Sequence, residues 1–206
     1  MIWSILQTKL IIALMKYLIV LIFAFSSCAT KYKNINLQSQ SYSNTEISED
    51  LIYSYKYDVL RSAGNKKYGK KEDKYDFKIV GVKIENLTNQ EIDVGKDLEF
   101  KVGDRIIHPL ETKSITDKIK QPVYTHLLYG LIWVDFKPGS VDDLVLPVGA
   151  PIAAYNVITA SKANSNFKNE FREYSLIDKT ILPKETIFGF ISYRDAEIGK
   201  LIITRK

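Results

Sequence analysis

The sequence predicts a mainly β protein, an antiparallel β-sandwich interrupted by a helical insertion at about 110–177. Three observations support this prediction. Short runs of alternating apolar and polar residues lie on both sides of the insertion, turn-forming residues separate these runs, and inside the insertion the apolar period lengthens from two residues to three or four. The length of 206 residues suits one domain, which we expect at 51–206.

Two long strands are expected before the insertion. Residues 52–59 alternate aromatic or aliphatic side chains with polar ones, which is typical of a half-buried strand. A charged, glycine-containing connection at 66–74 leads to a second run at 75–86. Both faces of this second run carry apolar residues, so we expect it in the centre of a sheet.

Shorter strands complete the sandwich. Gly103-Asp104 lies between two strand-like runs and is typical of a tight hairpin, and Pro183-Lys184-Glu185 is a turn by composition. About seven short strands with frequent turns favour a sandwich. The shorter strands are expected at 92–94, 98–102, 105–108, 186–193 and 201–204.

The insertion has an apolar first part and an amphipathic last part. From Pro151 to Tyr174, apolar residues recur at spacings of three or four, which predicts one helix over 151–175 with Pro151 in its first turn. The apolar segments 123–136 and 144–158 are each shorter than the roughly 20 residues that a spanning helix needs. We expect both segments to pack on the sandwich, as amphipathic stripes commonly do, and an interfacial hairpin on a bilayer is the alternative.

Two motifs carry a resemblance to a protein family. An Asn-Leu-Thr-Asn turn at 86–89 follows a long strand, and a Leu-Pro-Lys-Glu-Thr turn at 182–186 leads into an Ile-Phe-Gly-Phe-Ile strand. Over roughly 51–108 and 178–206, the chain resembles the small extracellular immunoglobulin-like domains of uncharacterised bacterial lipoproteins. The second motif usually reads Pro-Gly-Glu, and Lys184 stands at the glycine position. The resemblance implies an immunoglobulin-like sandwich in an exported protein, and it carries over no catalytic residue.

The N-terminus resembles a bacterial lipoprotein signal. A positive Met-Lys start at 15–16 is followed by an apolar core at 17–25 and by Ser-Ser-Cys at 26–28. This order resembles a lipobox, with Phe25 at a position where an aliphatic residue is usual. The resemblance implies that Cys28 becomes the lipidated N-terminal residue, and several acyl chains on one residue give stable anchoring.

We therefore expect a lipoprotein signal peptide at 1–27, with Met15 as an alternative true start. An uncleaved signal anchor is disfavoured because Lys9 and Lys16 interrupt it, and a lysine at the bilayer centre costs about 2.5–3.5 kcal/mol. Residues 28–50, rich in Ser, Asn, Gln and Thr, are expected to form a lipid-anchored flexible tether. Ala29 follows the cysteine in place of an aspartate, and by the family's sorting rule this favours the outer membrane over the inner membrane.

The composition argues against several kinds of site. The single cysteine leaves no intrachain disulfide, no redox pair and no cysteine-based zinc cluster, and two histidines give little basis for a metal site. We therefore expect no metal and no cofactor. Removing residues 1–27 takes away two lysines and no acidic residue, so the formal charge falls from +5 to about +3, too mild to indicate a nucleic-acid partner.

Three groups of residues are candidates for function. We expect an interaction surface on the insertion, formed by aromatic residues of its apolar part and by cations on its helix. The basic connection is a candidate for contact with anionic lipid. An unrecognised catalytic site near His108 and His126 is an alternative, although no nucleophile motif accompanies them. The residues are Tyr124, Tyr129, Trp133, Lys162, Lys168 and Arg172 for the interaction surface, and Lys66, Lys67, Lys70 and Lys71 for the lipid contact.

Together these patterns indicate a non-catalytic, lipid-anchored cell-envelope protein that acts as a binding or assembly module through its insertion. Its expected partners are the membrane, through lipidated Cys28, and an envelope protein. Two alternatives stay open: an envelope enzyme with a site near His108 and His126, and a protein that contacts the bilayer through segments 123–136 and 144–158.

Acyl labelling of the expressed protein tests the N-terminal prediction. Wild-type protein should incorporate labelled palmitate, and the Cys28→Ala variant should lose the label because a thioether-linked lipid needs the thiol. Equal absence of label from both proteins would contradict lipidation and favour a plain signal or an uncleaved anchor.

Overall fold

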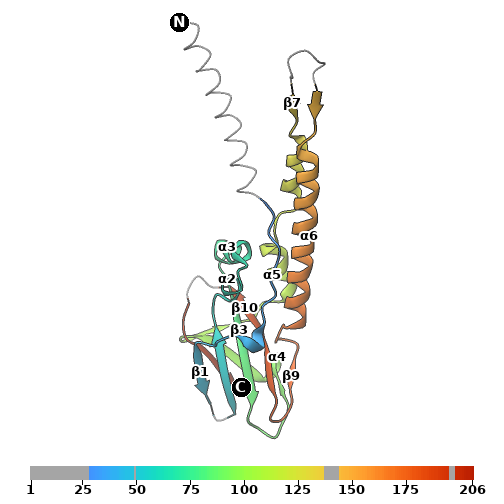
Figure 1. Cartoon of the computed structure of the whole chain (residues 1–206). Coiled ribbons are helices and arrows are strands. Elements are labelled where there is room, and N and C mark those ends of the chain that lie inside the picture. The colour runs from blue at the N-terminus through green and yellow to red at the C-terminus, as the bar shows by residue number, and fades with distance from the viewer. Residues whose placement is uncertain (1–27, 49, 137–143, 195–197) are drawn as a thin grey trace. The chain divides into compact units, whose positions relative to one another are not determined.

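The computed structural model describes residues 28–48, 50–136, 144–194 and 198–206 (Figure 1). These residues form two compact units. Unit 1 contains 28–30, 122–136 and 144–160, and unit 2 contains the described residues of 31–121 and 161–206. Helix α6 (Gly149–Glu173) contributes its first half to unit 1 and its second half to unit 2, which confirms the predicted helix over 151–175. The predicted signal peptide at 1–27 lies outside the described residues.

Two antiparallel sheets form the centre of unit 2. The larger contains β1 (Asn44–Ile47), β2 (Leu51–Lys56), β3 (Phe77–Asn86) and β10 (Thr186–Arg194), in that order across the sheet. The smaller contains β11 (Leu201–Arg205), β5 (Leu98–Val102) and β6 (Arg105–Ile107), in that order. The hairpin between β5 and β6 turns at Gly103-Asp104, where Gly103 has a φ of +59°, so the predicted hairpin is confirmed. A separate short pair joins β4 (Ile92–Asp93) to β9 (Thr180–Ile181).

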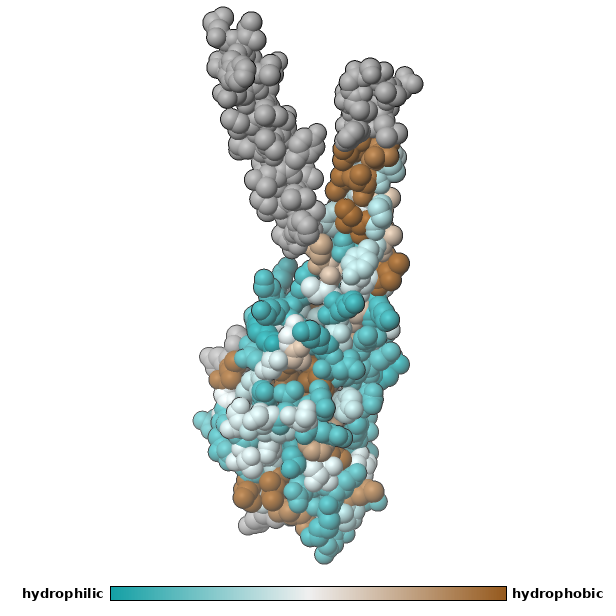
Figure 2. All heavy atoms as spheres, viewed as in Figure 1, coloured by the Kyte–Doolittle hydropathy of each residue, from teal (hydrophilic) through white to brown (hydrophobic). Residues whose placement is uncertain are grey.

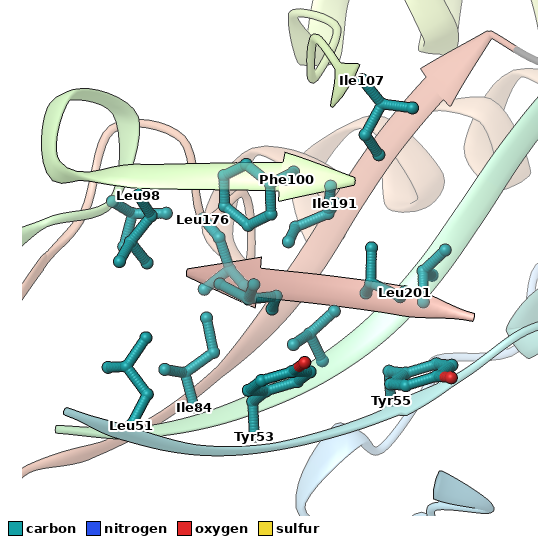
Figure 3. Close-up of a cluster of buried hydrophobic side chains, with 14 of the residues drawn as sticks. Leu51, Tyr53, Tyr55, Ile84, Leu98, Phe100, Ile107, Leu176, Ile191 and Leu201 are labelled. Atoms are coloured by element: carbon teal, nitrogen blue, oxygen red, sulfur yellow. The ribbon is translucent and has the colours of Figure 1, made fainter. Parts of the chain in front are cut away.

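One face of the larger sheet packs on the smaller sheet (Figure 3). Tyr53 of β2 lies opposite Ile84 of β3, and both point into a core that also contains Phe100 and Leu201 of the smaller sheet. Because side chains alternate along a strand, every second residue of β2 and β3 enters this core. Each fully buried side chain of this kind contributes about 1.5–3 kcal/mol. The predicted packing of two antiparallel sheets is confirmed.

Helices cover the other face of the larger sheet. Ile79 of β3 and Phe190 of β10 share a second core with Phe167 and Phe171 of α6. Phe171 stacks on Phe190, with ring centroids 4.5 Å apart and an interplanar angle of 5°. The same core receives residues from α2 (Val59–Ser62), α3 (Lys66–Lys74), α5 (Thr112–Ile119) and the 3-10 helix η1 (Leu37–Ser39).

The prediction of a mainly β fold therefore holds only in part, because unit 2 combines two packed antiparallel sheets with a layer of helices. The reason is that β3 is apolar on both faces, and each face needs a cover. One short helix, α4 (Val94–Asp97), follows β4 directly. Of the predicted insertion at 110–177, the described residues within 122–160 belong to unit 1, and the rest belong to unit 2.

The predicted flexible tether at 28–50 is also wrong for most of its length. Tyr32, Ile35 and Leu37 are buried in the helix-covered core, and residues 44–47 form β1. The backbone N–H of Ile35 donates to Glu170 Oε1 at 2.6 Å. The average composition of this segment is polar, but Tyr32, Ile35 and Leu37 are spaced so that all three reach the core, whereas Ile47 stays exposed.

The charged connection at 66–74 is the helix α3, not a loop. Tyr68, Gly69 and Glu72 face the interior, and the five lysines lie on the remaining surface. Glu72 Oε1 accepts a hydrogen bond from the backbone N–H of Ile79 at 2.8 Å. A helix that buries so few residues gives only a weak apolar period, which is why its pattern resembles a solvated loop.

The side chain of Asn164 joins α6 to the end of α5. Its Oδ1 accepts from the backbone N–H of Gln121 at 2.7 Å and from the hydroxyl of Tyr68 at 3.0 Å. Its Nδ2 donates to the carbonyl of Gln121 at 2.9 Å. One amide therefore satisfies both backbone groups of a residue that lies in no helix or strand.

We expect Asn164→Ala to lower the free energy of unfolding by about 3 kcal/mol, because it removes the hydrogen bonds that Asn164 makes to the N–H and the carbonyl of Gln121. Chemical denaturation measures the change. Asn166→Ala is the matched control: Asn166 lies on the same helix, is exposed, and should change the value by less than about 0.5 kcal/mol. Equal effects of the two variants would show that the Asn164 bonds do not stabilise the fold.

Candidate functional site

Unit 1 is built around the first half of α6. The 3-10 helix η2 (Tyr124–Leu131) leads to Ile132, whose carbonyl accepts from the backbone N–H of Gly149 at 3.0 Å. A Cβ added to Gly149 would lie 1.7 Å from the carbonyl oxygen of Tyr129, so only glycine permits this approach. The strands β7 (Val134–Phe136) and β8 (Leu144–Leu146) pair antiparallel, with Val134 opposite Leu146. Unit 1 is thus a small assembly of η2, a strand pair and three turns of α6.

The outside of unit 1 is apolar. Of the fourteen large apolar side chains that are exposed in the described part of the chain, ten lie in unit 1. Tyr124 is 84% exposed, Leu131 is 74% exposed and Ile158 is 66% exposed. Figure 2 shows apolar side chains, in brown, gathered on this unit. We call these ten residues the apolar surface: Tyr124, Leu127, Leu128, Leu131, Trp133, Val145, Leu146, Ile152, Tyr155 and Ile158.

The segments that carry the apolar surface contain no charged residue. Neither 121–134 nor 144–160 includes an Asp, Glu, Lys or Arg, although such residues make up 26% of the whole chain. A solvated surface normally mixes charges with apolar groups, and a large apolar patch marks a site for protein or membrane contact. The apolar surface of unit 1 is therefore a candidate site for contact with a protein or a membrane.

Cys28 lies in the same unit as the apolar surface. The residue after it, Ala29, donates its backbone N–H to Asn156 Oδ1 at 2.7 Å. Asn156 is only 1% exposed, and its Nδ2 donates to the carbonyl of Ile152 one helical turn earlier. A hydrogen bond to a buried amide fixes the position of the chain next to Cys28 on α6. The proposed lipidation site and the apolar surface are thus held together by the fold of one unit.

The three aromatic residues predicted for an interaction surface all lie in unit 1. Tyr124 and Trp133 are exposed, while Tyr129 is half-buried and stacks on His126 with ring centroids 6.2 Å apart. The expectation that segments 123–136 and 144–158 pack as core is wrong for the ten residues of the apolar surface. Sequence periodicity identifies an apolar stripe, but it does not show whether another element lies opposite.

The three predicted cations of α6 belong to unit 2. Lys162, Lys168 and Arg172 are exposed. Lys168 and Arg172 line a cleft of about 340 Å³ together with Thr112 and Thr116 of α5. The three aromatic residues lie in the other unit, so the role of these cations stays a prediction.

The predicted lipid-contacting lysines Lys66, Lys67, Lys70 and Lys71 all lie on α3. The ammonium group of Lys71 donates to the backbone carbonyl of Lys120, the C-terminal cap of α5. Burial lowers the pKa of Lys71, and the nearby charges of Lys74 and Lys120 lower it further. Lys74 lies one helical turn after Lys71 on α3, whereas Lys120 was missed by the sequence analysis, because only the packing of α3 on α5 brings it close to Lys71.

The two histidines lie in different units. His108 is exposed and lines a largely apolar cleft of about 350 Å³ in unit 2, whereas His126 is buried in unit 1. Within the described ranges, no group of three or more His, Cys, Asp or Glu side chains is placed to hold a metal ion. The structure offers no observation that favours the alternative of a catalytic site at these histidines.

Comparison of the chain with protein families, with curated proteins and with solved structures finds no match. Among the residues that the structure describes, no helix has both the length and the apolar content that crossing a bilayer requires. A function for this chain therefore has to be argued from the geometry and chemistry of its own residues.

Glu72 makes the stability of unit 2 depend on pH. Burial raises the pKa of its carboxyl from 4.5 to about 7, against the opposing effect of the Ile79 hydrogen bond. The folded state therefore holds the proton more tightly than the unfolded state, so the stabilisation is complete below about pH 4.5 and is lost as the pH rises through about 7. We expect the free energy of unfolding to fall by about 3 kcal/mol over this range.

The variant Glu72→Gln should remove most of this dependence, because an amide can still accept the hydrogen bond of Ile79 but does not titrate. Denaturation at a series of pH values measures the slope. Glu173→Gln, at an exposed carboxylate of α6, is the control and should keep the wild-type slope. Equal slopes in Glu72→Gln and wild type would contradict the assignment.

Proposed function

We propose that this chain is a non-catalytic, membrane-anchored cell-envelope protein that binds a lipid bilayer through the apolar surface of unit 1. The observation that carries the proposal is the apolar surface itself, which is exposed, carries no charge, and lies in the unit that contains Cys28. Burying apolar side chains in the acyl region is favourable by about 25 cal/mol per Å² removed from water.

A bilayer fits this surface better than a protein partner does. The ten residues come from η2, β8, α6 and Trp133 before β7, so they do not form one groove or one helix face that a single partner element would fill. Protein interfaces also carry a polar rim with charged groups, which segments 121–134 and 144–160 do not supply. Exposed Tyr124, Trp133 and Tyr155 are of the residue types that are enriched at the boundary between acyl chains and headgroups.

The charged residues near the strand pair favour an interfacial location over deep insertion. Asp135 lies in β7, and Lys137, Asp142 and Asp143 fall between β7 and β8 in the sequence. A charge at the middle of a bilayer costs about 2.5–3.5 kcal/mol, so the strand pair does not reach that depth. The exposed apolar side chains of η2 and α6 would lie in the outer part of the acyl region, in the unit that contains Cys28.

The lipoprotein assignment, the outer-membrane location and the envelope-protein partner stay predictions that are compatible with this proposal. An immunoglobulin-like sandwich also stays a prediction, and two findings support it. Two antiparallel sheets pack face to face, and Lys184 has a φ of +61°, the conformation that glycine adopts most easily, at the position where the resembled family has glycine.

Vesicle flotation tests the proposal. A chain of residues 29–206 lacks the N-terminal segment and keeps every described residue except Cys28, so any binding reports unit 1. We expect it to float with phosphatidylcholine vesicles. We also expect Leu131→Asp combined with Trp133→Asp to lower the bound fraction at least about tenfold, because a charge is costly in the acyl region.

Ile47→Asp is the matched control. Ile47 is 76% exposed on β1, almost the same as the 74% of Leu131, but it lies in unit 2. It should leave flotation unchanged. A folded chain of residues 29–206 that ignores vesicles would overturn the proposal, and so would an equal loss of binding in the control.

A further inference from the structure

Three lysines of unit 2 lie together where α3 meets the end of α5. The ammonium group of Lys71 donates to the carbonyl of Lys120, and the charges of Lys74 and Lys120 are close enough to lower the pKa of Lys71 beyond the effect of burial. Lys71 and Lys74 lie three residues apart on α3, and only Lys120, at the end of α5, is brought to them by the fold. Like charges held this close repel one another, and an anion placed among them relieves the repulsion.

The acidic residues of α3 do little to offset this charge. Glu72 is buried and its pKa is raised to about 7, so it is largely uncharged in mildly acidic solution. Asp73 is paired with Arg61 of α2. Asp117 of α5 pairs with Lys120. Its carboxylate lies 3.4 Å from the ammonium group and is exposed to solvent. An exposed pair of this kind contributes little, so the net local charge stays positive.

The chain itself limits the distance of Lys120 from the first residue of the second part of unit 1. Lys120 precedes Pro122, the first residue of that part of unit 1, by two residues, so their Cα atoms are at most about 7 Å apart. The other two passages between the units carry a lysine in the same way: Lys31 directly follows Thr30, and Lys162 follows Ala160 by two residues. This distance depends only on the length of the backbone.

We propose that Lys71, Lys74 and Lys120 bind the phosphate of anionic lipid headgroups, so that the apolar unit selects membranes rich in such lipids. This inference rests on the proposed function, since it needs unit 1 to lie in a bilayer. A lysine ammonium offers three donors on a flexible stem and binds phosphate as a point charge. An anionic surface attracts a lysine over about one Debye length, which is roughly 8 Å at physiological salt. The distance between the Cα atoms of Lys120 and Pro122 is no longer than this.

A soluble phosphate compound is the competing source of the same chemistry. The position of Lys120 beside the apolar unit favours the headgroup, because a headgroup is delivered by the bilayer that unit 1 enters. Capping of α5 by Lys71 alone is the structural alternative. It involves neither the charge of Lys74 nor that of Lys120.

Lipid retention by the full chain tests the inference. The 206-residue protein is purified in mild detergent with equal amounts of phosphatidylcholine and phosphatidylglycerol, and the retained lipids are counted by native mass spectrometry. Wild-type protein should retain phosphatidylglycerol over phosphatidylcholine by at least about fivefold, the factor that one lysine near an anionic surface supplies. The variant Lys71→Gln/Lys74→Gln/Lys120→Gln should retain the two lipids nearly equally.

Two further variants guard against a general effect of charge or folding. Replacement of the same three lysines by arginine keeps the charge and should keep the preference. Replacement of Lys83, Lys179 and Lys206 by glutamine removes three charges from other half-buried or exposed positions of unit 2 and should leave the preference unchanged. Loss of the preference in this control would overturn the inference.

The remaining outcomes separate this inference from the proposed function. Equal retention of both lipids by wild type would overturn the headgroup site while leaving bilayer binding in place. Retention of neither lipid would overturn both. Loss of the preference in inorganic phosphate, but not in sodium chloride of equal ionic strength, would assign the lysines to a soluble phosphate compound and overturn the headgroup. An unchanged preference in phosphate, or an equal loss in both salts, would support the headgroup.

Discussion

Asparagine side chains that are buried or half-buried hold the irregular parts of this chain in place, and the packing of the regular elements depends on them. Asn65 bonds to both the N–H and the carbonyl of Lys33, and Asn164 does the same for Gln121. Asn86 donates to three carbonyls, those of Gln90, Ile181 and Leu182. A buried backbone group without a partner costs about 1–3 kcal/mol, and a loop has no neighbouring strand to supply one. A single amide offers both a donor and an acceptor, so it replaces that strand.

Helix α6 meets two different environments along its length. Its second half buries Phe167 and Phe171 against the larger sheet, while its first half exposes Ile152, Tyr155 and Ile158. The second half is packed against a sheet, whereas the first half buries only small or polar residues, Ala153, Asn156 and Ala160, and leaves its large apolar side chains exposed. Asn156 and Asn164 lie on the two halves and bind the segments that run beside them. The exposed side of the first half is the part of α6 that the proposed membrane contact uses.

The distribution of charge follows the same division. Unit 1 carries no charged side chain in segments 121–134 and 144–160, whereas unit 2 carries lysines at each point where the chain passes into unit 1. Transfer of a charge into acyl chains costs several kcal/mol, and contact with anionic headgroups is favourable. Burial of Glu72 inside α3 raises the pKa of its carboxyl and leaves the lysines of that helix less neutralised. Stability and surface charge are thus linked through one buried carboxyl.

By itself, the sequence determined the features whose causes are local. Alternation predicts β2, β3, β10 and β11, Gly103-Asp104 predicts its hairpin, and spacings of three or four predict α6. The tertiary structure alone decided that residues 32–37 are packed, that 66–74 is a helix, and that the apolar surface is uncovered. Each of these depends on what lies opposite a side chain, which periodicity does not contain. For the same reason, the meeting of Lys71 with Lys120 required the packing of α3 against α5, because residues far apart in the chain come together only through the fold.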